Sequence, residues 1–181
     1  MRRIAVVGPT GSGKTTLAAA LAERLRIPHV ELDALHWGPG WATPELEAFR
    51  EFVTNALAGQ AWVVDGNYRK VRDVVWVRAD TLVWLDYPLW LTLWRLLRRT
   101  VRRVSSRETL WNGNRETWMG TLFARDSLLR LAVVGHRRMR RGYPAALQQP
   151  EYKHLCVVRL RTPKEARVWL AQAVESDEEE G

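Results

Sequence analysis

The chain has 181 residues, 46% of them hydrophobic and 27% charged, so length and composition suit one globular domain with a sizeable core. Its formal net charge is +8, and 24 of the 28 basic residues are arginine, whose planar fork suits phosphate groups. The single cysteine, Cys156, excludes an internal disulfide, and we find no signal-peptide pattern. The longest apolar-rich stretch, residues 81–97, contains Asp86 and Arg95 and is not a membrane span. We therefore expect a cytoplasmic protein without a membrane partner.

The N-terminal region has the pattern of a strand, a glycine-rich loop and a helix. The apolar residues 4–7 predict a buried strand, and the helix follows over residues 16–25. The loop has the G-x-x-x-x-G-K-T spacing of a Walker A phosphate loop, and its residues are Gly8, Pro9, Thr10, Gly11, Ser12, Gly13, Lys14 and Thr15. In such a loop, backbone N–H groups and the helix dipole hold phosphates, Lys14 reaches the outer phosphates and the Thr15 hydroxyl ligates Mg²⁺. We therefore predict that residues Gly8 to Thr16 bind ATP with Mg²⁺.

Three later strands are predicted to end in an aspartate. They cover residues 29–33, 61–65 and 81–86, and they end at Asp33, Asp65 and Asp86. The second and third are apolar on both faces, which is typical of central strands in a parallel sheet. Thr43 and Pro44 predict the start of a helix that ends at Gly59, between the first two strands. Ligands bind at the carboxyl ends of parallel strands, so this placement separates the three aspartates from ordinary surface acids.

Residues 88 to about 104 predict a helix that has an apolar face and a stripe of arginines spaced three and four residues apart. Such a stripe repels itself unless an anion lies against it, although a solvated helix face is the usual interpretation of a charge run. We favour a functional role for part of the stripe, because a bound triphosphate supplies the anion. Trp90 and Trp94 on this helix are predicted to be core residues. The polar residues 105–120 predict a mobile lid.

The C-terminal region predicts a helix from Leu128 to about Arg141, which residues 142–144 stop, and then a fifth strand over residues 155–160. A last helix begins at the capping box of residues 162–165 and runs to about Val174. Strands that alternate with helices after a phosphate loop predict an α/β, three-layer P-loop NTPase fold. We expect five parallel strands in the order 2-3-1-4-5, with helices on both faces and a short lid. Residues 1–174 would form this domain, and residues 175–181 a disordered acidic tail.

These features together resemble the adenylate kinase-type nucleoside and nucleotide kinases. A narrower resemblance is to the adenylate kinase-related proteins labelled DNA topology modulation (FlaR-type). It is carried by four segments: Leu32-Asp33-Ala34-Leu35-His36-Trp37, Gly40-Trp41, Trp62-Val63-Val64-Asp65-Gly66-Asn67-Tyr68 and Leu85-Asp86-Tyr87-Pro88. The resemblance covers nearly the whole chain before the acidic tail.

The resemblance implies a role for several residues of the ATP side. Asp65 matches the acid that holds Mg²⁺ through water, so Thr15 and Asp65 are the expected metal-binding pair. Arg95 and Arg99 match the arginine pair that meets the nucleotide. Arg115 or Arg125 would be the lid arginine that stabilises charge on the transferring phosphoryl group.

The acceptor side is expected to involve Asp33, His36, Trp37, Asn67 and Arg72. Asp33 matches a carboxylate that binds the acceptor or accepts its proton, and capping of the following turn is an equally good interpretation. Arg72 corresponds to the arginine after Asp-Gly in nucleotide kinases, although this chain departs from their Asp-Gly-Phe-Pro-Arg pattern. His36 is expected to line the pocket or to be held by a hydrogen bond. The loop tryptophans are candidates for stacking on a substrate ring: Trp37, Trp41, Trp111 and Trp118.

Two functions fit these residues. The first is an Mg²⁺-dependent phosphotransferase that moves the ATP γ-phosphoryl group to a small-molecule acceptor. The second is an ATP-binding, DNA-associated protein with little or no kinase activity. We favour the first because the arginines are explained as phosphate ligands and helix-end charges, and no DNA-reading motif is visible. The sequence leaves open whether the protein is a monomer or a dimer.

Overall fold

The computed structural model describes residues 1–106, 109, 111–114 and 128–178. Its centre is one parallel sheet of five strands in the order β2-β3-β1-β4-β5, as predicted. The strands are β1 (Arg3–Val7), β2 (His29–Glu31), β3 (Trp62–Asp65), β4 (Thr81–Leu85) and β5 (Cys156–Leu160). The predicted α/β fold with a 2-3-1-4-5 sheet is therefore confirmed.

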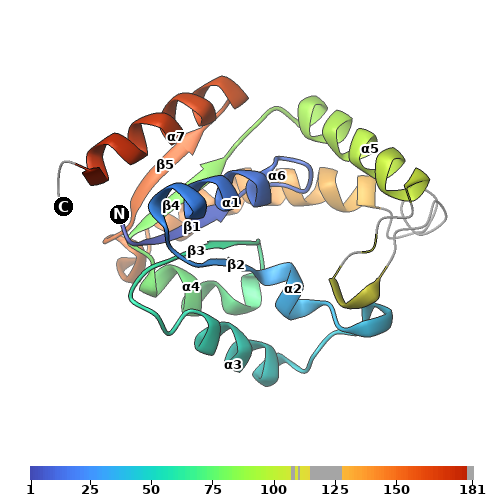
Figure 1. Ribbon diagram of the computed structural model, residues 1–181, viewed down its shortest axis with the longest axis horizontal. Helices are drawn as coiled ribbons and strands as arrows, with labels where there is room; N and C mark the ends of the chain where they lie inside the picture. The colour runs from blue at the N-terminus through green and yellow to red at the C-terminus, as the bar shows by residue number, and fades with distance from the viewer. Residues whose placement is uncertain (107–108, 110, 115–127, 179–181) are drawn as a thin grey trace.

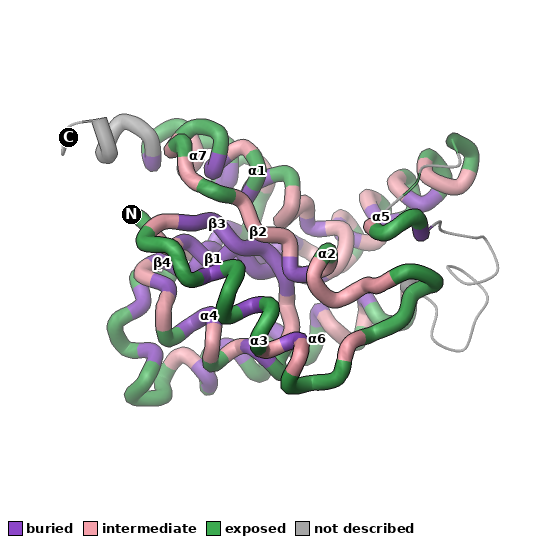
Figure 2. The backbone as a smooth tube through the Cα atoms, turned by 60° about the horizontal axis from the view of Figure 1, so that its bottom comes forward, coloured by how far each residue is buried: buried purple, intermediate pink, exposed green. Residues whose placement is uncertain are grey.

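Helices cover both faces of the sheet (Figure 1). One core layer joins the sheet to α1 (Lys14–Leu25) and α7 (Pro163–Glu178). The other joins it to α3 (Leu46–Ala56), α4 (Arg72–Arg78) and α6 (Leu128–Leu147). Every residue of β3 and β4 is buried, and Figure 2 shows the buried backbone gathered along the central strands. A parallel sheet covered on both faces requires apolar residues on both sides of its strands, which explains their continuous apolar runs.

The second strand is shorter than predicted. β2 ends at Glu31, and the next residues form the short helix α2 (Leu32–His36), which places Asp33 in its first turn. Leu32 is buried, and it packs so closely on Gly66 that a Cβ at Gly66 would lie 2.7 Å from the Leu32 Cβ. This contact turns the chain away from the sheet two residues earlier than the apolar pattern indicates. The 3-10 turn η1 (Pro39–Trp41) follows α2.

Two helix starts also differ from the prediction. α3 begins at Leu46 and makes no side-chain cap hydrogen bond, so Thr43 is not its N-cap. Helix α4, with the 3-10 turn η2 (Arg69–Val71) before it, was not predicted. Its seven residues are too short for a clear helical period, and the burial of Val75 and Trp76 against the sheet stabilises it.

Helix α5 (Leu89–Ser105) lies beyond the carboxyl ends of the strands and contacts α6 (Figure 1). Its buried residues are Thr92, Leu96 and Thr100, which form a narrow stripe. Trp90 and Trp94 lie outside this stripe and are 69% and 53% exposed. The prediction that these two tryptophans are core residues is therefore wrong, because among the described parts of the chain this projecting helix is buried along one narrow stripe.

Helix α6 continues through the residues that were predicted to stop it. Tyr143 is buried, and its ring lies 5.1 Å from that of Trp76 and 5.4 Å from that of Trp84. This packing offsets the backbone hydrogen bond that Pro144 cannot donate within the helix. α7 likewise runs to Glu178, past its predicted end near Val174. Among the described residues, no helix is both long and apolar enough to cross a membrane.

Candidate active site

The phosphate loop joins β1 to α1 in a conformation that depends on glycine. Gly11 and Gly13 have φ angles of 84° and 88°, in the left-handed region that favours glycine. A Cβ at Gly11 would lie 2.3 Å from the Thr92 carbonyl oxygen of α5, which no side chain tolerates. Within the loop, the Ser12 N–H donates to the Pro9 carbonyl at 3.0 Å. The loop therefore has the left-handed turns and the helix N-terminus of a backbone anion-binding site.

Asn67 fixes the base of this loop. The Gly8 N–H donates to Asn67 Oδ1 at 3.1 Å, and Asn67 Nδ2 donates to the Gly8 carbonyl. Gly8 and Pro9 are buried below the surface, whereas residues 10–16 line a cleft. Asn67 also borders the cleft, but both ends of its side-chain amide are engaged by Gly8. From two residues beyond the end of β3, Asn67 thus ties the phosphate loop to this strand.

Asp65 lies at the end of β3 between two partners. Its Oδ2 accepts a hydrogen bond from the Thr15 hydroxyl at 2.7 Å, and its Oδ1 lies 2.9 Å from His29 Nε2. Because a carboxylate only accepts, His29 Nε2 donates here. The Thr15 and Asp65 oxygens are hard ligands of the kind that Mg²⁺ prefers, so this pair fits the predicted metal. Among the residues that the structure describes, no cluster of three His, Cys, Asp or Glu residues could hold a metal alone.

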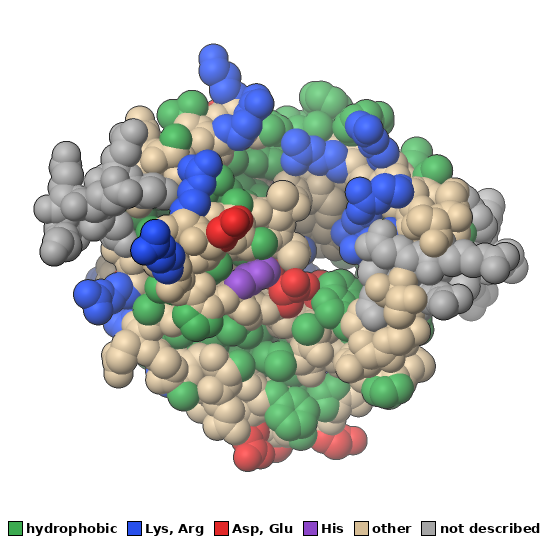
Figure 3. All heavy atoms as spheres, in the orientation of Figure 1, with side chains coloured by type: hydrophobic (Ala, Val, Ile, Leu, Met, Phe, Trp, Pro, Cys, Tyr) green, Lys and Arg blue, Asp and Glu red, His purple; other side chains and the backbone are tan. Residues whose placement is uncertain are grey.

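The arginine stripe of α5 faces the cleft. Arg95 donates from a guanidinium N–H to the Ser12 carbonyl at 3.1 Å, and its guanidinium lies 5.5 Å from the Tyr87 ring centroid. Arg99 also lines the cleft, together with Arg98, Arg102 and Arg103. Figure 3 shows basic side chains on the α5 side of a hollow in this face of the molecule. The structure thus brings Arg95 to the phosphate loop and Arg99 to the same cleft.

The cleft has a volume of about 2100 Å³ and lies at the carboxyl ends of the strands. A pocket for one drug-sized ligand has a volume of roughly 300–1,000 Å³. This cleft is therefore large enough for two substrates side by side. The phosphate loop and α5 border one part of it, and the end of β2, α2 and η1 border another.

Asp33 and Tyr68 both border the cleft and are joined by a hydrogen bond. The Tyr68 hydroxyl donates to Asp33 Oδ1 at 2.6 Å. Burial, followed by the nearby Asp33 carboxylate and this hydrogen bond, raises the pKa of Tyr68 well above its ordinary value, so the phenol remains a donor at neutral pH. Asp33 Oδ1 is thereby occupied, and Oδ2 is left for a ligand in the cleft. The sequence did not single out Tyr68, although it lies three residues after Asp65.

His36 supports this arrangement from outside the cleft. Its ring centroid lies 4.5 Å from that of Tyr68 and 4.8 Å from those of Phe49 and Trp37. Burial among these rings lowers the pKa of His36, an effect that Asp33 opposes and Lys70 reinforces. The imidazole does not border the cleft, so the structure places His36 behind the pocket lining, and a role in acceptor binding stays a prediction. The aromatic pattern after Asp33 instead builds a packed wall behind it.

Arg72 lies away from the cleft. Its guanidinium is 4.6 Å from the Trp76 ring centroid and 5.2 Å from that of Tyr143, where cation–π contacts stabilise the α4–α6 packing. The expectation that Arg72 binds the acceptor is not supported by this position. The altered spacing after Asp65-Gly66 places the arginine one turn further on, in α4, where it points into the layer below the sheet.

The turn η3 (Trp111–Gly113) closes the acceptor side through contacts that the sequence did not reveal. Trp111 Nε1 donates to Glu31 Oε2 at 3.0 Å, and Asn112 Nδ2 donates to the Trp37 carbonyl at 2.5 Å. Asn114 donates to the Gly38 carbonyl at 2.9 Å and accepts from the Trp41 N–H at 3.0 Å. The only local signal was that Glu31, like Asp33, lies near a strand end. Several residues of the predicted lid and site lie outside the described residues: Arg107, Arg115, Trp118 and Arg125.

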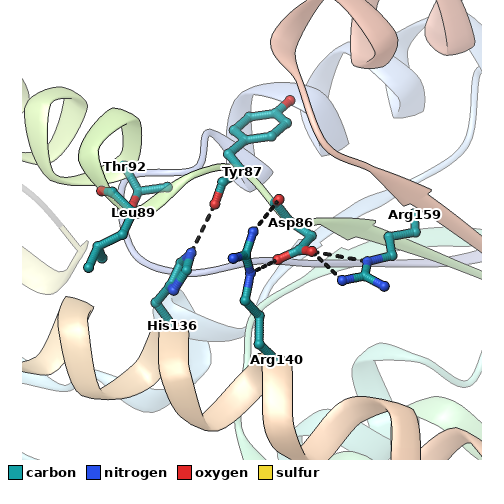
Figure 4. A network of polar contacts seen from close by, with 7 residues as sticks. All are labelled: Asp86, Tyr87, Leu89, Thr92, His136, Arg140 and Arg159. Atoms are coloured by element: carbon teal, nitrogen blue, oxygen red, sulfur yellow. Dashed lines mark hydrogen bonds and ion pairs between the residues drawn. The ribbon is translucent and has the colours of Figure 1, made fainter.

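Asp86 also follows a strand but has a different role (Figure 4). Its carboxylate accepts from Arg140 Nε at 2.6 Å and from the guanidinium of Arg159 at 2.5 and 3.0 Å. The neighbouring Tyr87 carbonyl is 2.9 Å from His136 Nε2. Asp86 is almost fully buried, and it does not border the cleft. It joins β4, β5 and α6. Its position at a strand end does set it apart from ordinary surface acids, but its role is structural and it is not a site residue.

The comparisons with known proteins agree with the fold. A model of the family described as ATPase family associated with various cellular activities (AAA) matches residues 4–73, less than half of the chain. A gluconokinase from Sinorhizobium meliloti 1021 is similar over 99% of this chain and 97% of its own, with a TM-score of 0.52 and 22% identity. A shikimate kinase from Acinetobacter baumannii, in complex with shikimate, is similar over 99% of this chain and 94% of its own, with a TM-score of 0.54 and 18% identity.

The chain has the P-loop kinase fold. A shikimate kinase from Bacteroides thetaiotaomicron is also similar, over 98% of each chain, with a TM-score of 0.53 and 15% identity. No curated protein matches the sequence significantly. At these identities the likeness shows the fold, and the narrower FlaR-type resemblance is not confirmed. The division into a domain over residues 1–174 and a tail, the cytoplasmic location and the oligomeric state stay predictions.

Proposed function

We propose that this protein is an Mg²⁺-dependent phosphotransferase that moves the γ-phosphoryl group of ATP to a hydroxyl group of a small molecule. One observation carries the proposal: the phosphate loop and the Asp33 carboxylate border the same cleft. A loop that binds only ATP does not need an oriented carboxylate across the cleft. A kinase needs one, because its acceptor hydroxyl must be held in line with the phosphate.

The chain's own residues would divide the work on the ATP side. The backbone of residues 10–16 holds the phosphates, and Lys14 neutralises the outer ones. Arg95, which is hydrogen-bonded to the loop, and Arg99 place positive charge where the transferred group gathers negative charge. Thr15 and Asp65 would hold Mg²⁺, which when bound neutralises phosphate charge and draws phosphate oxygens together.

Asp33 would act on the acceptor. With Oδ1 occupied by Tyr68, Oδ2 is free to accept a hydrogen bond from the acceptor hydroxyl and so to orient it. During transfer, the hydroxyl oxygen forms a bond to the γ-phosphorus, and the bond from that phosphorus to the β–γ bridging oxygen breaks. The hydroxyl proton passes to Asp33, and ADP leaves with the bond's electron pair. Positioning and charge neutralisation supply most of the catalysis in this scheme.

Two features support small molecules rather than DNA as the second substrate. The gluconokinase and shikimate kinases with this fold are, by their names, kinases of small hydroxylated acids. Arginines of α5 border the same cleft as the phosphate loop, where a bound triphosphate would lie within their reach. The DNA-associated alternative is therefore an outcome of the test below and not a second proposal.

The test is transfer of labelled γ-phosphate from ATP to a panel of nucleosides, nucleoside monophosphates, sugars and amino alcohols. We expect label in at least one acceptor, and we expect Lys14→Ala to abolish it. Lys153→Ala is the matched control, because Lys153 is exposed and lies outside the cleft. Label that stays in ATP or appears only as inorganic phosphate would overturn the proposal. Duplex DNA binding that falls steeply with salt would then favour the alternative.

A further inference from the structure

The two parts of the cleft differ sharply in charge. All lysine and arginine residues among the described lining residues come from α1, α5 and α7, on the ATP side. The described residues that line the opposite wall include no lysine or arginine. This wall has two carboxylates, from Glu31 and Asp33, and three indole rings, from Trp37, Trp41 and Trp111. A negatively charged acceptor would meet like charge on this wall. A positively charged group would meet opposite charge and aromatic faces.

The two carboxylates on this wall are held by neutral donors. Glu31 Oε2 accepts from the Trp111 indole N–H, and Asp33 Oδ1 accepts from the Tyr68 hydroxyl. Neither carboxylate forms an ion pair with a lysine or arginine of the described chain. Each therefore keeps one oxygen for a ligand, together with a charge that no described cation neutralises. A cationic ligand would supply the missing partner for Glu31 while Asp33 holds a hydroxyl.

The indole rings of this wall are fixed in place. The Trp37 and Trp41 ring centroids lie 5.5 Å apart with their planes at 82°, so the two rings meet edge to face. Trp111 is oriented by its hydrogen bond to Glu31, and Asn112 holds the Trp37 backbone. Rigid indoles beside a carboxylate are a recurrent way to bind ammonium groups, because the ring faces attract cations while excluding water.

We propose that the phosphoryl acceptor is a hydroxylated amine whose protonated nitrogen binds against Glu31 and the neighbouring indoles. This inference rests on the proposed function, because Asp33 holds the hydroxyl that receives the phosphoryl group. The ammonium group takes no part in the bond changes and stays protonated throughout. Glu31 is then the residue that determines specificity, and it acts through binding of the acceptor alone.

The experiment compares three acceptors on one scaffold: glucosamine, glucose and glucuronate, with 2-aminoethanol, ethylene glycol and glycolate as a smaller set. We expect kcat/KM to fall from the amine to the neutral compound to the carboxylate. In Glu31→Gln, kcat/KM for the amine should drop about tenfold or more, the size expected for a lost hydrogen bond to a charged group. The KM for ATP and kcat/KM for the neutral compound should change little.

Glu31→Gln keeps an oxygen that can accept from Trp111, so the variant preserves the wall. Glu51→Gln is the matched control, because Glu51 is exposed on α3 and does not border the cleft. The inference is wrong if a neutral or acidic compound is the best substrate of the wild type. It is also wrong if Glu31→Gln lowers kcat/KM equally for the amine, the neutral compound and the carboxylate. In both cases the proposed kinase function stands.

A binding measurement separates the two proposals when turnover fails. Thermal unfolding is followed with each compound, without ATP, in the wild type and Glu31→Gln; a ligand that binds the folded state raises the midpoint. If the amine stabilises the wild type but not Glu31→Gln, and no compound is phosphorylated, the cation site is supported and the kinase function is not. If the amines neither raise the midpoint nor serve as acceptors, the inference is overturned.

Discussion

The Thr15 hydroxyl donates to Asp65 Oδ2 at 2.7 Å, which joins the phosphate loop directly to the end of β3. The other Asp65 oxygen is held by His29 Nε2 at 2.9 Å. The carboxylate is therefore fixed on both sides before any ligand arrives. This arrangement pre-orients the two oxygen groups that would hold Mg²⁺, and it makes Asp65 the first residue to test.

Replacing Asp65 with asparagine should lower kcat by about 100-fold and raise the Mg²⁺ concentration needed for half-maximal rate, since the charge on the metal-binding oxygen is lost. Rates measured across a Mg²⁺ titration check this. Asp73→Asn is the control, because Asp73 is an exposed acid that pairs with Arg50 outside the cleft. An unchanged Mg²⁺ requirement in Asp65→Asn would show that Asp65 is not a metal ligand.

Replacing Tyr68 with phenylalanine should lower kcat/KM for the acceptor by roughly tenfold, because Asp33 loses a hydrogen bond to a charged oxygen. The KM for ATP should stay the same, since the hydrogen bond and ring contacts of Tyr68 are to Asp33, His36 and Phe49 and not to the phosphate loop. Steady-state kinetics in both substrates separate the two effects. The control is Tyr152→Phe, a buried tyrosine outside the cleft. Equal losses for ATP and acceptor would indicate general damage instead of a positioning role.

Stability should fall at mildly acidic pH because of His36. Burial lowers the folded-state pKa of this imidazole below 6.5, so between that pKa and 6.5 the unfolded chain binds more protons than the folded one. The free energy of unfolding should therefore decrease as pH falls from 6.5 toward the folded-state pKa. His36→Gln should show a smaller decrease in denaturant unfolding, whereas His154→Gln, at an exposed position, should follow the wild type. Parallel curves for His36→Gln and wild type would refute this.

Replacing Asp86 with asparagine should cost about 2–4 kcal/mol in the free energy of unfolding, because a buried carboxylate that holds two arginines is lost. The matched surface change, Asp73→Asn, should cost less than about 1 kcal/mol, because its pair with Arg50 is exposed. Denaturant titrations compare the two. The KM for ATP of folded Asp86→Asn should be close to that of the wild type, and a large rise in it would place Asp86 in the site.

Much of the fold follows from local signals in the sequence. The continuous apolar runs of β1, β3 and β4 and the glycine spacing of the phosphate loop are each complete within a few residues, and the sheet order was expected because these signals together are typical of the P-loop NTPase fold. The exposed side of α5 and the continuation of α6 past Pro144 could not be predicted. Both depend on where distant residues lie: Trp90 is 69% exposed, whereas Tyr143 packs on Trp76.

The residues of the site likewise divide into those that local sequence signals predict and those that depend on distant partners. Asp33 and Asp65 were predicted because each follows a strand, and both lie at the carboxyl edge of the sheet. Asp86 carried the same local signal, yet Arg140 and Arg159, more than 50 positions later, make it structural. The contact between Glu31 and Trp111 joins residues 80 positions apart, and nothing near either residue indicates it. Long-range partners therefore decide which strand-end acid serves which role.

The most direct test of the central claim is a single-turnover assay with γ-labelled ATP, the purified protein and the acceptor panel, run for the wild type and Lys14→Ala. The account predicts that label moves from ATP into an acceptor with the wild type, and that the rate falls by at least about a thousandfold when the loop lysine is removed. ATP that binds but yields no labelled acceptor with any hydroxyl compound would contradict it, as would transfer that survives in Lys14→Ala.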